Sequence, residues 1–185
     1  MIKTFISIFL ILSVLPLVNA YDLIDNGGLD YYISYLNDGD NLTRLQAITH
    51  IVDLKDAKGL LPLIEIMRSD GDWKIRAAAA KGLGDFANAG QVEPLIQALN
   101  YDPDSYVRSD AANALGSLND TRAIGPLNIA LEDKNPMVRS AAAYALGGLG
   151  NAKAMDSLNK TLNDQDQTVR TAAEWSLDKL HHAAS

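Results

Sequence analysis

Apolar side chains recur along the chain with the spacing of amphipathic helices. Leu60, Leu63 and Met67 stand three and four residues apart, which places them on one face of a helix. The same slots return in four further copies, occupied by Leu29, Tyr32 and Leu36; Val92, Leu95 and Leu99; Ile124, Leu127 and Leu131; Met155, Leu158 and Leu162. The pattern therefore predicts a first helix in each of five similar units.

A second periodic stretch follows each predicted helix after a polar turn rich in Asp, Asn and Gly. In the stretch 75–84 it opens on Ile-Arg, continues with alanines and closes on Leu-Gly. The arginines that mark the copies are Arg44, Arg76, Arg108, Arg139 and Arg170, at intervals of 32, 32, 31 and 31 residues. One helix-turn-helix unit cannot bury its apolar face alone, so the fixed period predicts a stack of units with a continuous core.

The second helix of each unit has a predicted core face. Positions one before and three, seven and ten after the repeat arginine fall on one side at 100° per residue. In the second unit these positions hold Ile75, Ala79, Leu83 and Phe86. Alanine lets neighbouring helices approach closely. Glycines near the expected helix ends are placed to stop the helices, and these are Gly84, Gly116 and Gly147.

Residues 1–20 have the layout of a cleavable secretory signal peptide. Lys3 precedes an apolar run at 5–18, and Ala20 ends a small-residue cleavage site. As a helix the run would span about 21 Å, against roughly 30 Å of bilayer hydrocarbon. We therefore expect export, with an uncleaved anchor as the alternative. The expected organisation is a leader at 1–20, a short lead at 21–24, a repeat domain at 25–180 and a tail at 181–185, the repeats being 25–55, 56–87, 88–119, 120–150 and 151–180.

The combined pattern resembles a known family. The first helices carry Pro-Leu and end on Ala-Leu in the best copy, and the second helices read Val-Arg-x-x-Ala-Ala-x-Ala-Leu-Gly. This is similar to the short HEAT-like repeats of the phycobilisome-lyase type. The resemblance implies an all-α fold, a right-handed α-α superhelix (a HEAT/armadillo-like solenoid) of five helix-turn-helix repeats. It does not imply one function, because such folds host unrelated activities.

An aspartate stands six residues before the arginine of each unit. A carboxylate in the turn can bind a guanidinium of its own or the next unit in a bidentate pair, and proteins with similar repeats are tied together by such a ladder. The alternative is a row of arginines that binds phosphate or carboxylate ligands. The ladder residues are Asp38, Arg44, Asp70, Arg76, Asp102, Arg108, Asp133, Arg139, Asp164 and Arg170.

The side of the second helix opposite the core is the place to look for a partner. In HEAT-like solenoids this side lines the concave surface, and here it comprises the positions one and five after each arginine. The first row is mostly small. The second row changes from Thr49 through Lys81 and Asn113 to Tyr144 and Trp175. Exposed aromatic residues are common at protein-binding hot spots. Trp175 could instead shield the polar C-terminal end of the stack, together with the tail.

Composition excludes several function classes. The net charge is −7, which does not favour nucleic-acid binding, because such binding requires positive side chains that neutralise phosphates. There are no cysteines, and the three histidines lack the His-Glu pairs of iron-binding relatives. His50 occupies a slot that holds Gly82 and Ala114 elsewhere, so we expect it to be packed. We expect no enzyme, no metal and no cofactor, but a monomeric scaffold for a protein or peptide. The alternative is a lyase- or chaperone-like auxiliary.

Overall fold

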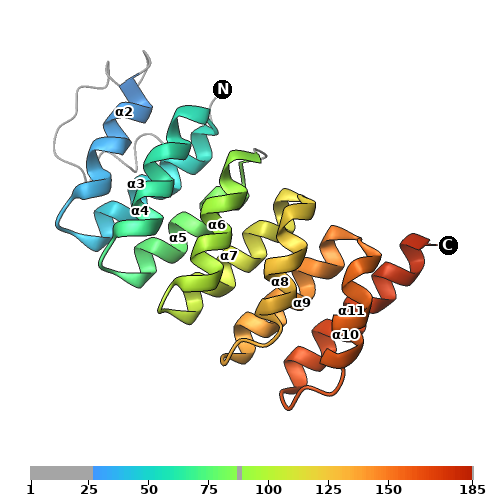
Figure 1. Cartoon of the computed structure of the whole chain (residues 1–185). Helices are drawn as coiled ribbons and strands as arrows, with labels where there is room; N and C mark the ends of the chain where they lie inside the picture. The colour runs from blue at the N-terminus through green and yellow to red at the C-terminus, as the bar shows by residue number, and fades with distance from the viewer. Residues whose placement is uncertain (1–26, 87–88, 185) are drawn as a thin grey trace, which may run out of the picture.

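The computed structural model describes residues 27–86 and 89–184, so the expected leader lies outside the described residues. The described residues form α-helices and short 3-10 turns, with no strand among them. Five helical hairpins lie side by side in a row, from α2 and α3 at the N-terminal end to α10 and α11 at the C-terminal end (Figure 1). The expected all-α solenoid is confirmed.

Each hairpin joins a shorter first helix to a second helix. The first helices are α2 (Gly27–Ser34), α4 (Leu60–Ser69), α6 (Val92–Tyr101), α8 (Ile124–Ala130) and α10 (Met155–Thr161). The second helices are α3 (Asn41–Leu54), α5 (Trp73–Gly84), α7 (Ser105–Leu118), α9 (Pro136–Leu149) and α11 (Gln167–Ala184). The 3-10 turns are η1 (Tyr35–Asn37), η2 (Ala57–Gly59), η3 (Ala89–Gln91), η4 (Thr121–Ala123) and η5 (Ala152–Ala154).

Short polar side chains fix where the helices begin. Asp72 accepts the backbone N–H of Lys74 at 2.8 Å and so caps α5. The same role at the other second helices belongs to Asp40, Asp104, Asn135 and Asp166. A second set caps the 3-10 turns that lead into the first helices, and consists of Asp56, Asp120 and Asn151. Asp25 and Asn88, which hold the corresponding positions of the sequence in the other two repeats, lie outside the described residues.

The core follows the predicted face of the second helices. Ile75, Ala79 and Leu83 are fully buried, and Phe86 is nearly so. Val138, Ala142 and Leu146 take the same positions in α9 and are also fully buried. These side chains pack against the apolar slots of the first helices in one continuous cluster. Burial of this stripe is what holds each unit to the next.

The glycines at the predicted helix ends have a different role from the one expected. Gly116 and Gly147 lie inside α7 and α9, and the helices continue past them to a left-handed residue, Asn119 or Gly150. A Cβ added at Gly116 would lie 2.9 Å from the Cα of Ala145 in the next repeat. The prediction of helix stops was therefore wrong for these two. The glycines are needed because neighbouring second helices approach too closely for a side chain.

The second helices form the tightly packed layer of the solenoid. The most extensive contacts between repeats join α5 to α7, α7 to α9 and α9 to α11, whereas α4 and α6 or α6 and α8 touch much less. The first helices therefore fan apart, and the layer of second helices is the inner one. The side of α3, α5, α7, α9 and α11 that faces away from the first helices is the concave face.

The C-terminal residues extend the last helix. Residues 181–184 belong to α11, although the sequence analysis set 181–185 apart as a tail. The stretch contains no helix-breaking residue and ends on alanines, the strongest helix formers. The ring Nδ1 of His182 lies 2.8 Å from the carbonyl oxygen of Asp178, one turn earlier. Among the helices of the described part, none combines the length and the apolar character that a membrane span requires.

Candidate protein-binding surface

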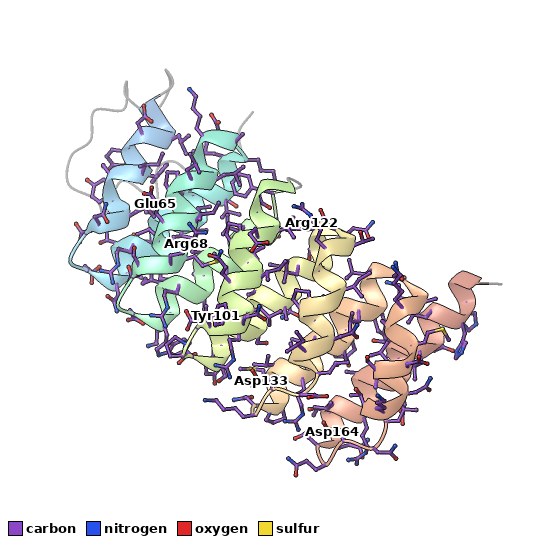
Figure 2. All side chains as sticks on the ribbon, in the orientation of Figure 1. Glu65, Arg68, Tyr101, Arg122, Asp133 and Asp164 are labelled. Atoms are coloured by element: carbon purple, nitrogen blue, oxygen red, sulfur yellow. The ribbon has the colours of Figure 1, made fainter. Side chains whose placement is uncertain are left out.

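The repeat arginines bind the aspartate of the following repeat. Arg76 donates from Nε and Nη2 to the two carboxylate oxygens of Asp102, at 2.8 and 2.9 Å. Arg108 holds Asp133 in the same way, at 2.8 and 2.9 Å, and Arg139 holds Asp164 at 2.7 Å twice. Asp133 and Asp164 stand at the same ends of successive hairpins (Figure 2).

A second bond ties each arginine to its own repeat. The Nη1 of Arg108 donates to the carbonyl oxygen of Asp102 at 3.0 Å, and Nη1 of Arg139 donates to that of Asp133 at 2.9 Å. Each guanidinium thus bridges two turns. The Arg139 guanidinium beside Asp164 holds the pKa of that carboxyl below its usual value. These guanidinium groups are already neutralised, which argues against the alternative of an anion-binding row.

The ladder weakens at its ends. The Nε of Arg44 lies 2.9 Å from Asp70, but the hydrogen bond to that carboxylate comes from Nη2 at 3.2 Å. Arg170 has no ion pair within 27–86 and 89–184; it bonds two backbone carbonyls of its own turn and the side chain of Gln167. The carboxylate of Asp38 accepts only the N–H of Asp40 among the described residues, and its backbone carbonyl accepts from Nη1 of Arg44 at 2.6 Å. Repeat stacking therefore explains the paired members of the ladder. Within the described part of the chain, Asp38 in the first repeat and Arg170 in the last have no ladder partner in a neighbouring repeat.

The column five residues after each arginine is exposed throughout. Lys81 and Asn113 lie open on the concave face, and Tyr144 and Trp175 are 42% and 47% exposed. The rings of Tyr144 and Trp175 touch edge to face, with centroids 5.4 Å apart. The ammonium of Lys179 lies 5.2 Å from the Trp175 ring centroid. The structure thus brings together the two aromatic residues of the expected surface.

The other expected row is covered within the stack. Ala77 and Ser109, one residue after their arginines, are buried, and Ser140 is half-buried, whereas Thr171 in the last helix is exposed. The expectation was wrong for Ala77 and Ser109 because the close approach of the next second helix covers this position. Positions two before and nine after the arginine take its place. In α11 these are Thr168 and Lys179, which are exposed beside Trp175. The concave face is therefore made of positions −2, +5 and +9 relative to each arginine.

A second aromatic pair was missed by the sequence analysis. Tyr106 of α7, two residues before Arg108, is 52% exposed. Its ring stacks on Trp73 of α5, with ring centroids 4.7 Å apart and planes 21° from parallel. The ammonium of Lys74 lies 5.8 Å from the Trp73 ring centroid. Helical periodicity could have placed Tyr106 on this face, since positions −2 and +5 differ by only about 20° around the helix. Trp73 stands three residues before its arginine, so its contact with Tyr106 comes from the stacking of the repeats.

The C-terminal end of the stack is polar, as expected of a cap, with one exception. Glu174, Asp178 and Lys179 are exposed. Ser176, a polar residue of the same helix, is fully buried and donates to the carbonyl oxygen of Ala143 at 2.8 Å. This serine takes the place of Ala114 and Ala145 in the earlier repeats, so its hydroxyl faces inward and binds the neighbouring helix.

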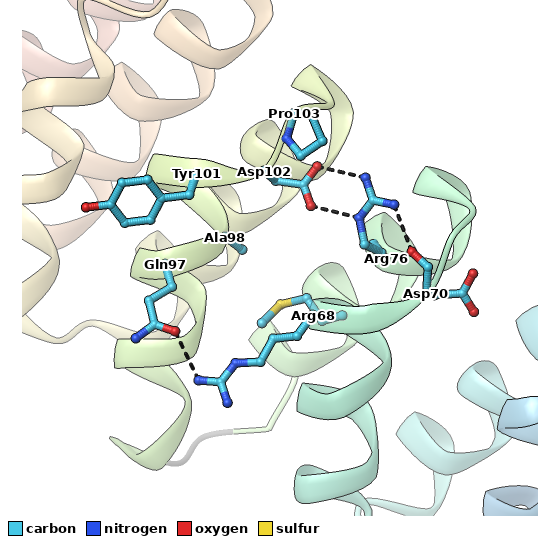
Figure 3. A pocket seen from close by; sticks show the side chains of 9 residues that line it. Arg68, Asp70, Arg76, Gln97, Ala98, Tyr101, Asp102 and Pro103 are labelled. Carbon is cyan, nitrogen blue, oxygen red and sulfur yellow. Dashed lines mark hydrogen bonds and ion pairs between the residues drawn. The ribbon is translucent and has the colours of Figure 1, made fainter.

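The hollows of the surface lie between the fanned first helices. One of them has a volume of about 530 Å³ and lies between α4 and α6 (Figure 3). Arg68 donates a hydrogen bond to Gln97 at 3.1 Å beside it, and the Arg76–Asp102 pair also lines it. Tyr101 stands at its rim, 81% exposed. Sequence reasoning did not foresee this groove because spacing along one helix says little about gaps between helices.

The histidines show no arrangement suited to a metal. His50 is half-buried and stacks on Tyr32, with ring centroids 4.4 Å apart. His182 is exposed and contacts Asp178 at 3.5 Å. Within residues 27–86 and 89–184, no group of three or more potential ligands is placed to hold a metal ion.

Comparisons with known proteins agree with this architecture. A family model of HEAT repeats matches residues 29–113 and 92–178. The complex of CpcE and CpcF of phycocyanin lyase from Nostoc sp. PCC7120 is similar over 90% of this chain and 71% of that chain, at 25% identity and a TM-score of 0.74. A designed armadillo repeat protein in complex with the peptide (KR)4 shares the fold, at 18% identity, 86% and 84% coverage and a TM-score of 0.60. No curated protein matches. With a family model that spans most of the described repeats, and with arginine-bridged hairpins along the stack, the chain belongs to the HEAT-repeat family.

Proposed function

We propose that the protein is an exported, non-enzymatic scaffold that binds a protein or peptide on its concave face. The observation that carries the proposal is the exposed Tyr144–Trp175 pair, which stands on that face beside Lys179. Large aromatic side chains that remain in solvent are favourable anchors for a partner, because binding buries their apolar area. The repeated arginines, aspartates and alanines, by contrast, are accounted for by stacking.

The variable column supports binding rather than catalysis. Lys81, Asn113, Tyr144 and Trp175 differ in chemistry from repeat to repeat, although their backbone positions are equivalent. A row of this kind can read successive residues of an extended partner. Solenoid repeats commonly use their concave surface in this way.

A comparison of two double variants tests the binding surface. Tyr144→Ala with Trp175→Ala removes the aromatic pair. Leu61→Ala with Ile129→Ala removes two side chains, each 71% exposed, from the first helices α4 and α8. Both proteins would be used as bait in pulldowns from envelope and culture fractions of the native host. We expect the first variant to lose partners that the parent and the second variant recover. Equal recovery by all three would reject the surface.

Export is proposed from the leader at 1–20, which precedes the described residues. Mass spectrometry of the protein from its native host would check this, with a mature chain that begins at Tyr21 as the expected result. A chain that retains Met1 in a membrane fraction would support the anchor instead.

A second candidate is an auxiliary that assists cofactor attachment or enzyme maturation. It is favoured by the similarity to the CpcE–CpcF complex of phycocyanin lyase, which extends over most of this chain. Absorption spectra and metal analysis of the protein from its native host distinguish the two candidates. A bound chromophore or metal would favour the auxiliary, whereas a colourless, metal-free protein would favour the scaffold.

A further inference from the structure

Two aromatic pairs of the same composition stand on the inner layer of helices. Each consists of one tryptophan and one tyrosine from neighbouring repeats, Trp73 with Tyr106 and Trp175 with Tyr144. In each pair a lysine ammonium lies over the indole, 5.8 Å from the centroid of Trp73 and 5.2 Å from that of Trp175. The same construction therefore occurs twice, in repeats 2–3 and in repeats 4–5.

Their separation follows from helix geometry. The two pairs are two repeats apart, which corresponds to about 19 Å for helices packed 9–10 Å from one another. Along the helix axis they differ by about eight residues, or about 12 Å. The line between them crosses the concave face diagonally over about 22 Å. An extended peptide covers this distance in about six to seven residues.

The surface between the pairs suits a peptide backbone. Asn113 of α7 lies exposed on one side of the diagonal, and its side chain has no hydrogen-bond partner among residues 27–86 and 89–184. An amide supplies both a donor and an acceptor, as a peptide backbone requires. Met137 of α9, on the other side of the diagonal, is half-buried and adds a flexible apolar contact.

Lys74 and Lys179 determine which charge on a partner each end of the diagonal attracts. Lys74 and Lys179 are exposed, and neither forms an ion pair with a carboxylate of the described part of the chain. Because an ammonium already lies over each indole, a cationic side chain of a partner would be repelled there, whereas a carboxylate would be attracted. Local charges dominate at contact distance, because exposed charges beyond about 8 Å are largely screened at physiological salt.

We propose that the concave face binds an extended peptide with two large apolar side chains about six to seven residues apart, each adjacent to an acidic residue. One apolar side chain packs on Trp73 and Tyr106, and the other on Tyr144 and Trp175. The neighbouring carboxylates accept hydrogen bonds from Lys74 and Lys179. This inference rests on the proposed function, which it deepens by naming the chemistry of the partner.

Selection from a phage-displayed library of random dodecapeptides on the full chain tests the proposal. We expect enriched peptides with two apolar residues five to seven positions apart, each next to Asp or Glu. For synthetic copies of these peptides, Tyr106→Ala and Trp175→Ala should each weaken binding about tenfold or more. Tyr101→Ala, which removes an exposed tyrosine outside the concave face, should change the affinity less than twofold. Lys74→Gln and Lys179→Gln should each weaken binding about threefold and reduce its dependence on salt.

The outcomes separate this inference from the function on which it rests. No enrichment, enrichment of basic peptides or of peptides with a single anchor, or full affinity in Tyr106→Ala would overturn the two-anchor acidic peptide. If the two-anchor acidic peptide failed but pulldowns from native fractions still depended on Tyr144 and Trp175, the proposed scaffold function would stand and only the proposed peptide would be rejected. If neither selected peptides nor native partners depended on the aromatic residues, both proposals would fail.

Discussion

Arg108 and Asp133 belong to consecutive repeats and form a bidentate ion pair, with Nε and Nη2 at 2.8 and 2.9 Å from the two carboxylate oxygens. Arg108 is only 5% exposed, so its charge depends on this partner and on the carbonyl oxygens of the turn at 102–103. Breaking a buried pair by removing one partner is costly, because the remaining charge stays desolvated. The ladder is thus where the alignment of repeats is most sensitive to a single change.

Asp133→Asn should therefore destabilise the protein by about 2–3 kcal/mol. The asparagine can still accept the N–H of Asn135, which isolates the effect on Arg108. Asp38→Asn is the matched control, since the Asp38 carboxylate caps its turn through the N–H of Asp40 and binds no guanidinium among the described residues. The bond from Nη1 of Arg44 goes to the backbone carbonyl of Asp38, which the substitution leaves in place. Urea unfolding followed by circular dichroism gives both values. Equal losses in the two variants would contradict the ladder as a source of stability.

Gly116→Ala and Gly125→Ala should change stability in opposite directions. The new methyl group at 116 would lie 2.9 Å from the Cα of Ala145, so two packed helices must separate, at a cost of about 1–3 kcal/mol. At 125 nothing lies within 4 Å of the added Cβ, and alanine favours the helix by about 0.5–1 kcal/mol. Thermal melts of both variants measure the difference. Stabilisation by both substitutions would show that the helices are not in close contact at Gly116.

Gln91 is a buried amide in a slot that other repeats fill with a small residue. It is fully buried, and neither its Nε2 nor its Oε1 has a hydrogen-bond partner in the described structure. The equivalent residues are Gly59, Ala123 and Ala154. An unsatisfied buried polar group costs about 1–3 kcal/mol, so Gln91→Met, which keeps the shape, should stabilise the fold by about 1 kcal/mol. Gln46→Met, in α3, serves as the control for the change of residue type, because the Gln46 side chain has no hydrogen-bond partner among the described residues. A loss of stability in Gln91→Met would point to a bound water or another partner of the amide.

The ladder carboxylates predict a loss of stability in acid. The pKa of Asp164 is lowered in the folded state by the hydrogen bonds from Arg139, so the folded protein binds protons less readily than the unfolded chain. Its contribution is fully present above the unfolded pKa of about 3.9 and is lost as the pH falls through the lower folded value. Asp164→Asn should be less stable than the parent at pH 7 and lose less stability between pH 5 and pH 3. Parallel stability curves for the two proteins would contradict this assignment.

Much of the fold could be predicted from the sequence because the same pattern of apolar positions recurs in each repeat. The slots of Leu63, Leu95, Leu127 and Leu158 recur at a fixed period, and all four are fully buried. The exposure of Lys81 and Asn113 follows from the same periodicity. Errors occurred where neighbouring repeats meet. Ala77 and Ser109 were expected on the surface but are covered, since helical phase alone does not say how closely the next helix approaches.

The candidate surface was likewise predicted in part from periodicity, while its contacts between repeats were not. Periodicity placed Tyr144 and Trp175 in one column, but their edge-to-face contact needed two repeats brought side by side. Trp73 and Tyr106 stand 33 residues apart in different helical positions, so that only the stack pairs them. Local spacing is enough to predict the helices, their buried faces and the family, because each of these depends on residues close together in the chain. The repeat that each arginine binds, the need for glycine at 116 and the aromatic residues that share a surface depend instead on distances between helices, which no local pattern encodes.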